Sequence, residues 1–244
     1  MTQTTPQRAL VIVAHPDDIE FGAAGTIANW TDAGIQVVYC MVTNGAAGSN
    51  DPDADLNALI RSRQEEQCAA AAIVGVTDVR FLGYPDGALQ PTMELRRDLT
   101  RLIRDLKPDR VMIQDPTLIL AGSFYINHPD HRATGEAALY AVFPSAETRP
   151  IFPELLAEGY EPHHVTELWL QFSEKADEVV DITTQIDRKI KALLSHKSQV
   201  GPEVEEMVRQ WDREAGKPYG YQYAETYRVM RFPRDEEKPK EDAS

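Results

Sequence analysis

Short apolar runs alternate with helix-like stretches along most of this 244-residue chain. Length and apolar content predict strands at residues 9–14, 36–42, 78–82, 110–114 and 167–172. Helical spacing predicts helices at residues 19–33, 56–74, 92–106, 130–141 and 183–196. Strands that alternate with helices favour a parallel sheet. We therefore expect one α/β domain over residues 1–232, Rossmann-like, with a mostly parallel sheet and helices on both faces.

Composition narrows the class of protein. With 42% hydrophobic and 26% charged residues, the chain has the make-up of a soluble globular protein. No apolar run approaches the roughly 20 residues of a membrane span, and we expect no signal peptide. The two cysteines, Cys40 and Cys68, do not suggest a disulfide framework, so we predict a cytoplasmic location. The polar, acidic segment 233–244 is predicted to be a disordered tail.

The net charge of −14 disfavours nucleic acid and anionic membrane surfaces as partners. Polar motifs instead follow the predicted strands: "HPDD" after the first, "TNGAAGS" after the second and "GYPDG" after the third. The long segment "DPTLILAGSFYINHPDH" follows the fourth. Because the carboxyl ends of parallel strands meet at one edge of a sheet, these motifs are expected to converge there, at the active site.

Two of these motifs, His15 to Asp18 and His128 to His131, place histidine and aspartate around a proline. Each alone is explained by a helix cap and a loop histidine. Together they bring three of the six histidines to one edge, which indicates a metal site. Nitrogen and oxygen ligands without a thiolate suit Zn²⁺ and also admit other divalent ions. Three protein ligands leave a position for water, which is typical of catalytic sites.

The motifs "AHPDDIEFG" and "HPDH" together resemble the LmbE/PIG-L family of zinc-dependent N-deacetylases. The similarity extends to "RQEE", "FLGYPDG", "HKSQ" and "YAETYR", and covers residues 9 to about 230. The resemblance implies a Zn²⁺-dependent hydrolase that removes an N-acyl group, typically N-acetyl, from an amino sugar or its conjugate. N-acetylglucosamine-type sugars are the expected substrates, and the acidic chain leans towards a small soluble glycoside.

The resemblance also implies a role for each residue of the two motifs. The zinc ligands would be His15, Asp18 and His131. Asp17 would be the general base, His128 would stabilise the oxyanion or act as an acid, and Asp130 would orient His128. These roles supply what amide hydrolysis needs: an activated water, an oxyanion stabiliser and a proton for the leaving amine.

Arg63 lies within an apolar stripe of the predicted helix 56–74. A buried guanidinium needs a carboxylate or a polar ligand, and Asp86 of "GYPDG" is a candidate. The resemblance assigns this pair to the hydroxyls of the sugar; a purely structural ion pair is the alternative. His196 either lines the pocket or neutralises a helix C-terminus. Asp115 either faces the site or begins a turn.

Other functions stay open. The same family includes amidases of thiol-sugar conjugates, and a non-catalytic sugar-binding or nucleotide-binding module could share the fold. Neither G-x-G-x-x-G nor a P-loop follows a strand, which argues against nucleotide binding. The complete ligand set and Asp17 argue against a non-catalytic module. Apolar residues within 141–156 suggest a contact between identical subunits.

Overall fold

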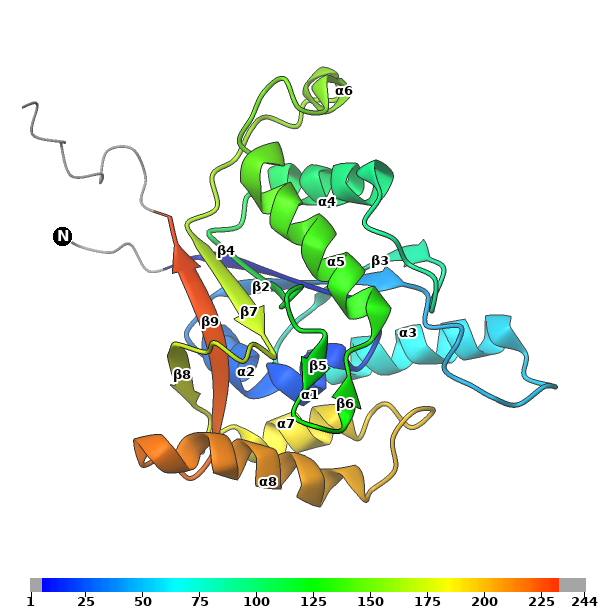
Figure 1. The fold of residues 1–244 in the computed structure, drawn as a ribbon, viewed down its shortest axis with the longest axis vertical. Coiled ribbons are helices and arrows are strands. Elements are labelled where there is room, and N and C mark those ends of the chain that lie inside the picture. Colours follow the sequence, from blue (N-terminus) through cyan, green and yellow to red (C-terminus); the bar gives the residue numbers. More distant parts are fainter. Residues whose placement is uncertain (1–5, 233–244) are drawn as a thin grey trace, which may run out of the picture.

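The computed structural model describes residues 6–232 (Figure 1). Its main strands are β1 (Arg8–Val13), β2 (Gln36–Thr43), β3 (Asp78–Tyr84), β4 (Arg110–Gln114), β7 (Glu167–Gln171), β8 (Glu178–Asp181) and β9 (Ala224–Arg231). They form one sheet in the order β3-β2-β1-β4-β7-β9-β8. The strands from β3 to β7 are parallel, whereas β9 is antiparallel to both of its neighbours. The mostly parallel, Rossmann-like sheet is therefore confirmed.

Helices cover both faces of this sheet (Figure 1). They are α1 (Asp18–Gly22), α2 (Ala24–Asp32), α3 (Leu56–Ile73), α4 (Met93–Leu106), α5 (Pro129–Tyr140), α6 (Pro153–Ala157), α7 (Ile186–Leu193) and α8 (Val204–Gly216). Alternate side chains of β1 point to opposite faces. Ala9 and Val11 pack with residues of α2 and α3, whereas Leu10 and Ile12 pack with residues of α4 and α5. The expectation of helices on both faces is confirmed.

Local signals in the sequence explain where the long helices begin. The Asp55 side chain accepts a hydrogen bond from the backbone N–H of Ala58 and caps α3. Thr92 caps α4 in the same way through the N–H of Leu95.

No helix of the described residues is long and apolar enough to cross a membrane.

Several elements depart from the prediction, most of them in the second half of the chain. The predicted helix 19–33 is two helices that meet at Ala23, and the predicted helix 183–196 spans only Ile186–Leu193. The strands β8 and β9, the helix α8 and the small hairpin of β5 (Leu120–Ala121) and β6 (Tyr125–Ile126) were not predicted. The tail predicted at 233–244 lies outside the described residues.

A buried ionic cluster fastens α8 to the sheet. The Nζ of Lys189 on α7 lies 2.8 Å from Asp212 Oδ2 on α8 and 2.9 Å from Glu225 Oε1 on β9. Lys189 is fully buried. Glu225 also accepts hydrogen bonds from the backbone N–H groups of Gly25 and Thr26 at the start of α2. Because a buried ammonium is stable only with such partners, this cluster fixes α7, α8, β9 and α2 relative to one another.

Candidate active site

The turn after β1 holds Asp17 in a conformation that is unusual for its residue type. Its φ is 97°, in the left-handed region that disfavours side chains, at a cost of about 1–3 kcal/mol. The Asp17 N–H donates to Gln67 Oε1 at 2.9 Å, and the N–H of His15 donates to Asp18 Oδ2 at 2.8 Å. Strain that is held by surrounding contacts is common where side chains must point at a functional centre.

Three side chains, from the turn itself, α1 and α5, meet here at the carboxyl end of the sheet. His131 Nε2 lies 3.0 Å from Asp18 Oδ1 and 3.3 Å from His15 Nδ1. His15 Nδ1 lies 3.4 Å from Asp18 Oδ2. Atoms bound to one tetrahedral zinc ion at about 2.0–2.1 Å stand about 3.3 Å apart. The structure therefore brings together the three residues that were predicted as ligands, with the two histidines facing different oxygens of the Asp18 carboxylate.

The start of α5 places His131 in this group. Pro129 occupies the first turn of the helix, and the Nδ1 of His128 accepts a hydrogen bond from the N–H of Asp130. Gly135 lies where α5 touches the end of β4: a Cβ there would be 2.3 Å from the carbonyl oxygen of Gln114. Only glycine allows this approach, so Gly135 fixes the distance between α5 and the sheet edge.

Hydrogen bonds assign the proton of His131. Its Nδ1 lies 3.1 Å from Asn127 Oδ1, while Asn127 Nδ2 donates to the carbonyl of Leu118 at 2.9 Å. The Asn127 oxygen can only accept, so His131 donates from Nδ1. Its Nε2 then turns a lone pair towards Asp18. A second partner that fixes the tautomer is a regular feature of metal-binding histidines.

His15 is oriented in the same manner, by carboxylates at the ring nitrogen that faces away from His131 and Asp18. Its Nε2 lies 3.0 Å from Asp86 Oδ1 and 3.4 Å from Asp130 Oδ2. A proton on Nε2 leaves the lone pair of Nδ1 facing His131 and Asp18. Two nitrogen lone pairs and a carboxylate that point at one another repel unless a cation joins them, so the donor set fits a metal ion.

The surrounding carboxylates make this position attractive to positive charge. Burial opposes protonation of His15, yet Asp18, Asp130 and Asp86 raise its pKa to about 12, so without a bound cation both ring nitrogens of His15 carry a proton. A divalent cation in the same field would replace the proton on Nδ1 and use its lone pair. His128 offers another ligand nitrogen, because the ligand atoms of His15, His128 and His131 lie within 4.8 Å of one another. A second group with this spacing is formed by His15, Asp86, His128 and Asp130.

Asp17 lies beside this group but contacts Arg63. Its Oδ2 is 3.2 Å from Arg63 Nη2, and the guanidinium also donates to the carbonyls of Pro16 at 2.7 Å and Gly45 at 2.9 Å. Burial and the neighbouring Asp18 carboxylate raise the pKa of Asp17 to about 7, against the attraction of Arg63. A carboxylate with such a pKa can accept a proton near neutral pH.

The predicted pair of Arg63 and Asp86 is close but is not the main contact of either residue. Arg63 Nη1 lies 3.9 Å from Asp86 Oδ2, and Arg63 is 4% exposed. The shorter contacts are those of Arg63 with Asp17 and of Asp86 with His15. Asp86 also accepts from the N–H of Ala47 at 2.9 Å. Arg63 is thus linked to the side chain that was predicted as the base.

The carboxylate of Asp130 contacts His15. Its carboxylate accepts from the backbone N–H groups of Gly87 at 2.7 Å and Leu89 at 3.1 Å, and it faces His15. The hydrogen bond between His128 and Asp130 is donated by the backbone N–H of Asp130, and the Asp130 carboxylate also acts on His128 through its charge. The expected orientation of His128 by Asp130 stays a prediction. Burial and the nearby His15 lower the pKa of His128.

A buried hydrogen-bond chain behind Asp17 escaped the sequence analysis. Gln67 Oε1 accepts from Asp17, Gln67 Nε2 donates to Glu20 Oε1 at 3.0 Å, and Glu20 Oε2 lies 3.1 Å from His196 Nε2. Gln67, Glu20 and His196 are fully buried. His196 thus binds a carboxylate rather than a helix terminus. The sequence did contain a signal for Gln67, because this residue lies one helical turn after Arg63 on the same face of the helix.

Asp115 begins a turn, which was one of its two expected roles. Its Oδ1 accepts from the backbone N–H of Thr117 at 2.8 Å and from the Thr117 hydroxyl at 2.7 Å.

Asn127 was not predicted as a site residue. Its position directly before the "HPDH" motif, one helical turn from His131, is the signal that could have found it.

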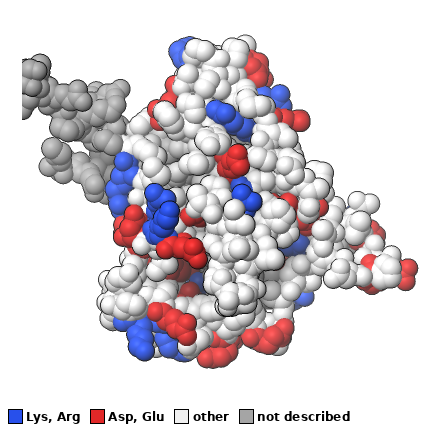
Figure 2. Space-filling view, viewed as in Figure 1, with Lys and Arg blue, Asp and Glu red and all other residues white. Residues whose placement is uncertain are grey.

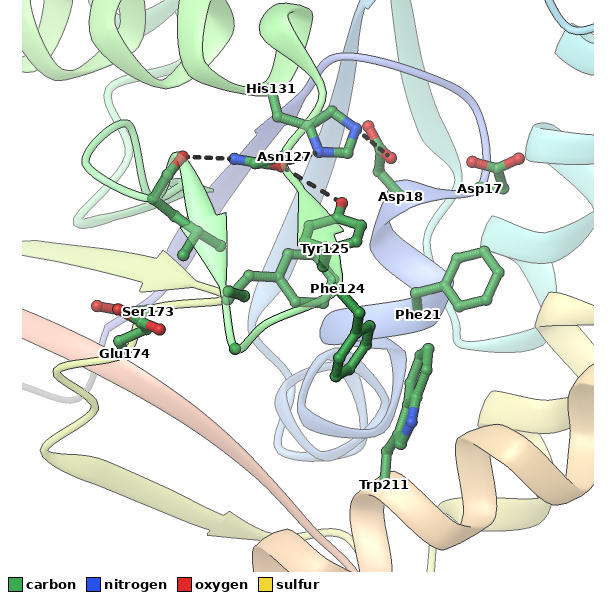
Figure 3. Close-up of a pocket in the computed structure, with 14 residues that line it drawn as sticks. Asp17, Asp18, Phe21, Phe124, Tyr125, Asn127, His131, Ser173, Glu174 and Trp211 are labelled. Atoms are coloured by element: carbon green, nitrogen blue, oxygen red, sulfur yellow. Dashed lines mark hydrogen bonds and ion pairs between the residues drawn. The ribbon is translucent and has the colours of Figure 1, made fainter.

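The site opens into a cavity of about 600 Å³ (Figure 3). Asp17, Asp18 and His131 line one end of this cavity, and Trp211 lies at the opposite end. Its described lining residues are Asp17, Asp18, Phe21, Leu118, Ala121, Gly122, Phe124, Tyr125, Asn127, His131, Phe172, Ser173, Glu174 and Trp211. Asp17, Asp18 and His131 are therefore accessible to a ligand, whereas His15, His128, Arg63 and Asp86 are not among the described lining residues.

Fold and site define an α/β enzyme with a His/Asp group that is able to bind a metal at the carboxyl edge of its sheet. Residues 10–142 match the family described as PIG-L: GlcNAc-PI de-N-acetylase. The chain belongs to this PIG-L/LmbE family of N-deacetylases, which hydrolyse amides.

Two curated relatives and one solved structure illustrate the relationship. Diacetylchitobiose deacetylase of Thermococcus kodakarensis is 34% identical over 232 residues, covering 92% of this chain and 83% of the relative. Probable N-acetyl-alpha-D-glucosaminyl L-malate deacetylase 2 of Bacillus anthracis is 29% identical over 211 residues, covering 84% and 87%. The structure of N,N'-diacetylchitobiose deacetylase from Pyrococcus horikoshii matches with a TM-score of 0.86 and 32% identity, covering 93% of this chain and 84% of that chain.

Proposed function

We propose that this protein is a Zn²⁺-dependent N-deacetylase that releases acetate from an N-acetylated amino sugar or its conjugate. The observation that carries the proposal is the meeting of His15, Asp18 and His131 beside the Asp17 carboxylate, at the end of one cavity. The deacetylase relatives support the same reaction class. Zn²⁺ is the proposed ion because two imidazole nitrogens and one carboxylate oxygen are donors that it favours.

His15, Asp18 and His131 would hold the ion, which when bound lowers the pKa of water and polarises the acetyl carbonyl. Asp17 accepts the proton of the attacking water at its carboxylate. Arg63 holds one oxygen of Asp17, so the base keeps its direction while it changes charge. The two adjacent aspartates thus have different roles: Asp18 would bind the metal ion, and Asp17 accepts the proton.

His128 acts on the substrate side. Its ring lies edge-on to that of His15, with centroids 4.6 Å apart, and is only partly buried. From there it donates to the developing oxyanion or to the leaving amine. Asp130 and Asp86 support this chemistry indirectly, since both hold His15 in its orientation. Arg63 and Asp86 are also proposed to bind hydroxyl groups of the sugar.

Two further proposals concern the protein's surroundings. Cys40 and Cys68 are free thiols, which supports a cytoplasmic location. Phe143, in the apolar segment 141–156, is 62% exposed, which supports burial of this segment between identical subunits. Sedimentation that shows a monomer at working concentration would reject the subunit contact.

Metal analysis combined with acetate release tests the proposed reaction. The purified protein, loaded with Zn²⁺, is expected to hold about one ion per chain and to release acetate from members of a panel of N-acetylated sugars. A chelator should abolish release, and added Zn²⁺ should restore it. Acetate release that survives complete metal removal, or a metal-loaded protein that is inactive on the whole panel, contradicts the proposal. An amidase would instead cleave thiol-sugar conjugates only.

A further inference from the structure

Glu20 and His196 form a fully buried pair of polar side chains for which the proposed reaction has no role so far. Glu20 lies on α1, two residues after Asp18, and His196 follows α7. We propose that both are positioning residues, which orient the amide of Gln67 and through it the proposed base, Asp17. This inference rests on the proposed deacetylase function and adds two residues to the machinery of that site.

The burial of this pair is unusual for such polar groups. Figure 2 shows acidic and basic side chains scattered over the surface, where water solvates them, whereas Glu20 and His196 are fully buried. Glu20 Oε2 lies 3.1 Å from His196 Nε2. Among the described residues the His196 ring has no other hydrogen-bond partner, since its Nδ1 meets none. Burying a carboxylate without a donor is strongly unfavourable, so His196 serves to hold Glu20 in place.

Glu20 determines which end of the Gln67 amide faces Asp17. Gln67 Nε2 donates to Glu20 Oε1 at 3.0 Å, and Gln67 Oε1 accepts from the Asp17 N–H at 2.9 Å. Because a carboxylate only accepts and a backbone N–H only donates, one orientation of the amide satisfies both contacts. In the reverse orientation, the amide oxygen would face the carboxylate and the amide N–H groups would face the N–H of Asp17. Glu20 therefore selects the orientation in which Gln67 holds Asp17.

The backbone of Asp17 depends on this hydrogen bond. Its φ of 97° lies in the left-handed region, which a residue with a side chain occupies only where neighbouring contacts hold it. Gln67 holds the N–H of Asp17, and Arg63, one helical turn earlier on α3, holds its carboxylate at 3.2 Å. The same helix thus fixes the backbone and the side chain of the base. A small displacement of a catalytic group lowers the rate of the step in which it acts.

The pair lies outside the space that a ligand would occupy. Neither Glu20 nor His196 belongs to the described lining of the cavity, and their side chains bond to Gln67 and to each other rather than to a proposed metal ligand. Their effect on the reaction therefore passes through Gln67 and Asp17. A positioning role changes kcat and leaves KM and metal content unchanged, whereas a purely structural pair changes stability alone.

Glu20→Met tests the pair, because it removes the acceptor for Gln67 and keeps a side chain of similar size. We expect kcat to fall about tenfold, with KM and metal content unchanged. Glu20→Gln keeps an oxygen that can accept from Gln67 and should retain most of kcat. Glu167→Met is the matched control: Glu167 pairs with Arg110 at 2.7 Å at the start of β7, and its removal should lower stability but not kcat.

Two combined variants show whether the pair acts through Gln67. Glu20→Met added to Gln67→Ala should cause no further loss of kcat, because residues that act through one shared contact are not additive. Glu20→Met with His196→Phe replaces the buried pair by apolar side chains, which commonly preserves stability. In thermal melts this variant should regain the stability that Glu20→Met loses, yet its kcat should stay low. It also carries the comparison if Glu20→Met alone does not fold.

The exchange rate of the Asp17 backbone amide, measured by NMR, reports the contact independently of turnover. It should rise about tenfold or more in Glu20→Met and stay unchanged in Glu167→Met. Unchanged exchange, a kcat equal to the wild type, additive losses with Gln67→Ala, or a kcat restored by His196→Phe would each overturn the positioning role while the deacetylase function stands. A metal-loaded wild type that is inactive on every N-acetylated sugar rejects the proposed function, and this inference with it.

Discussion

The two ends of the cavity are built in opposite ways. At the metal end, the side chains of His15, Asp18 and His131 are at most 15% exposed, and each has a defined polar partner. At the aromatic end, Phe124 and Trp211 are half or more exposed. Hydrogen bonds in a buried site fix the position of a side chain to a fraction of an ångström, whereas apolar contacts constrain little more than the area that is buried. We infer that the metal end determines the reaction and the aromatic end determines the substrate.

The two ends of the cavity also rest on different parts of the fold. The metal end rests on β1 and α5, in the parallel part of the sheet. The aromatic end rests on a short hairpin and on α8, next to the antiparallel edge (Figure 1). Substitutions at the metal end should therefore change turnover, and substitutions at the aromatic end should change selectivity.

The largest effect is expected when a ligand of the metal end is removed. His131→Ala should lose both metal and activity, because two remaining ligands hold an ion poorly. His128→Ala should keep the metal and lose about 10²–10³ in kcat, since it removes a donor to the oxyanion. Elemental analysis beside turnover separates these cases. Metal loss in His128→Ala, with metal kept in Asp18→Asn, would assign the third ligand to His128.

Arg63→Ala should lower kcat/KM about a hundredfold while the metal content stays unchanged. The variant removes a charge-assisted hydrogen bond to Asp17, worth about 2–4 kcal/mol in a desolvated site. Arg63→Lys keeps the charge but cannot reach Pro16, Gly45 and Asp17 together, so it should recover only part of the loss. A destabilised variant with normal kcat/KM would show that Arg63 is purely structural.

A smaller effect is expected from the hydrogen-bond chain behind Asp17. Gln67→Ala removes the acceptor for the Asp17 N–H, and one such bond is worth about 1–1.5 kcal/mol. We expect kcat to fall about tenfold with KM and metal content nearly unchanged. Glu65→Ala, exposed on the same helix, is the control. Equal kcat in both variants would leave Gln67 without a positioning role.

The smallest effect on activity is expected at the cluster that anchors the aromatic end. Burial, together with repulsion from Glu225, raises the pKa of Asp212 to about 7, against the attraction of Lys189. Between its ordinary value of 3.8 and pH 7, the folded state binds more protons than the unfolded chain. The contribution of Asp212 to stability is therefore present below about pH 4 and is lost as the pH rises through about 7.

Denaturant unfolding of the wild type and Asp212→Asn at several pH values measures this contribution. The stability of the wild type relative to the variant should fall by on the order of a few kcal/mol between pH 4 and pH 8. Turnover at the metal end should keep the same pH dependence in both proteins. A relative stability that rises with pH would contradict the assignment.

The metal end was largely readable from the sequence and the aromatic end was not. The "HPDD" and "HPDH" motifs carry their chemistry in adjacent residues, and the parallel sheet brings strand ends together by a general rule. The contact of Asp130 with His15 and that of Arg63 with Asp17 depend on side-chain directions, which spacing does not determine. These details needed the structure.

The aromatic end could not be predicted from the sequence for a different physical reason. The strands β5 and β6 contain two residues each, too few to show periodicity, and Phe124 belongs to their turn. Trp211 lies on α8, whose contacts with β9 join segments that no local pattern connects. Phe21 and Phe172 look like ordinary core residues in the sequence. A binding surface assembled from such separate pieces has no motif.

The division of roles between Asp17 and Asp18 is the central claim, and Asp17→Asn tests it most directly. The amide keeps the shape of the side chain but cannot accept the proton of water. Metal content by elemental analysis and single-turnover deacetylation of the metal-loaded variant give the two readouts. We predict metal close to the wild-type level and a loss of about 10²–10⁴ in the rate of the chemical step. Loss of the metal from Asp17→Asn, or a rate equal to that of the wild type, would contradict the assignment of Asp17 as the base.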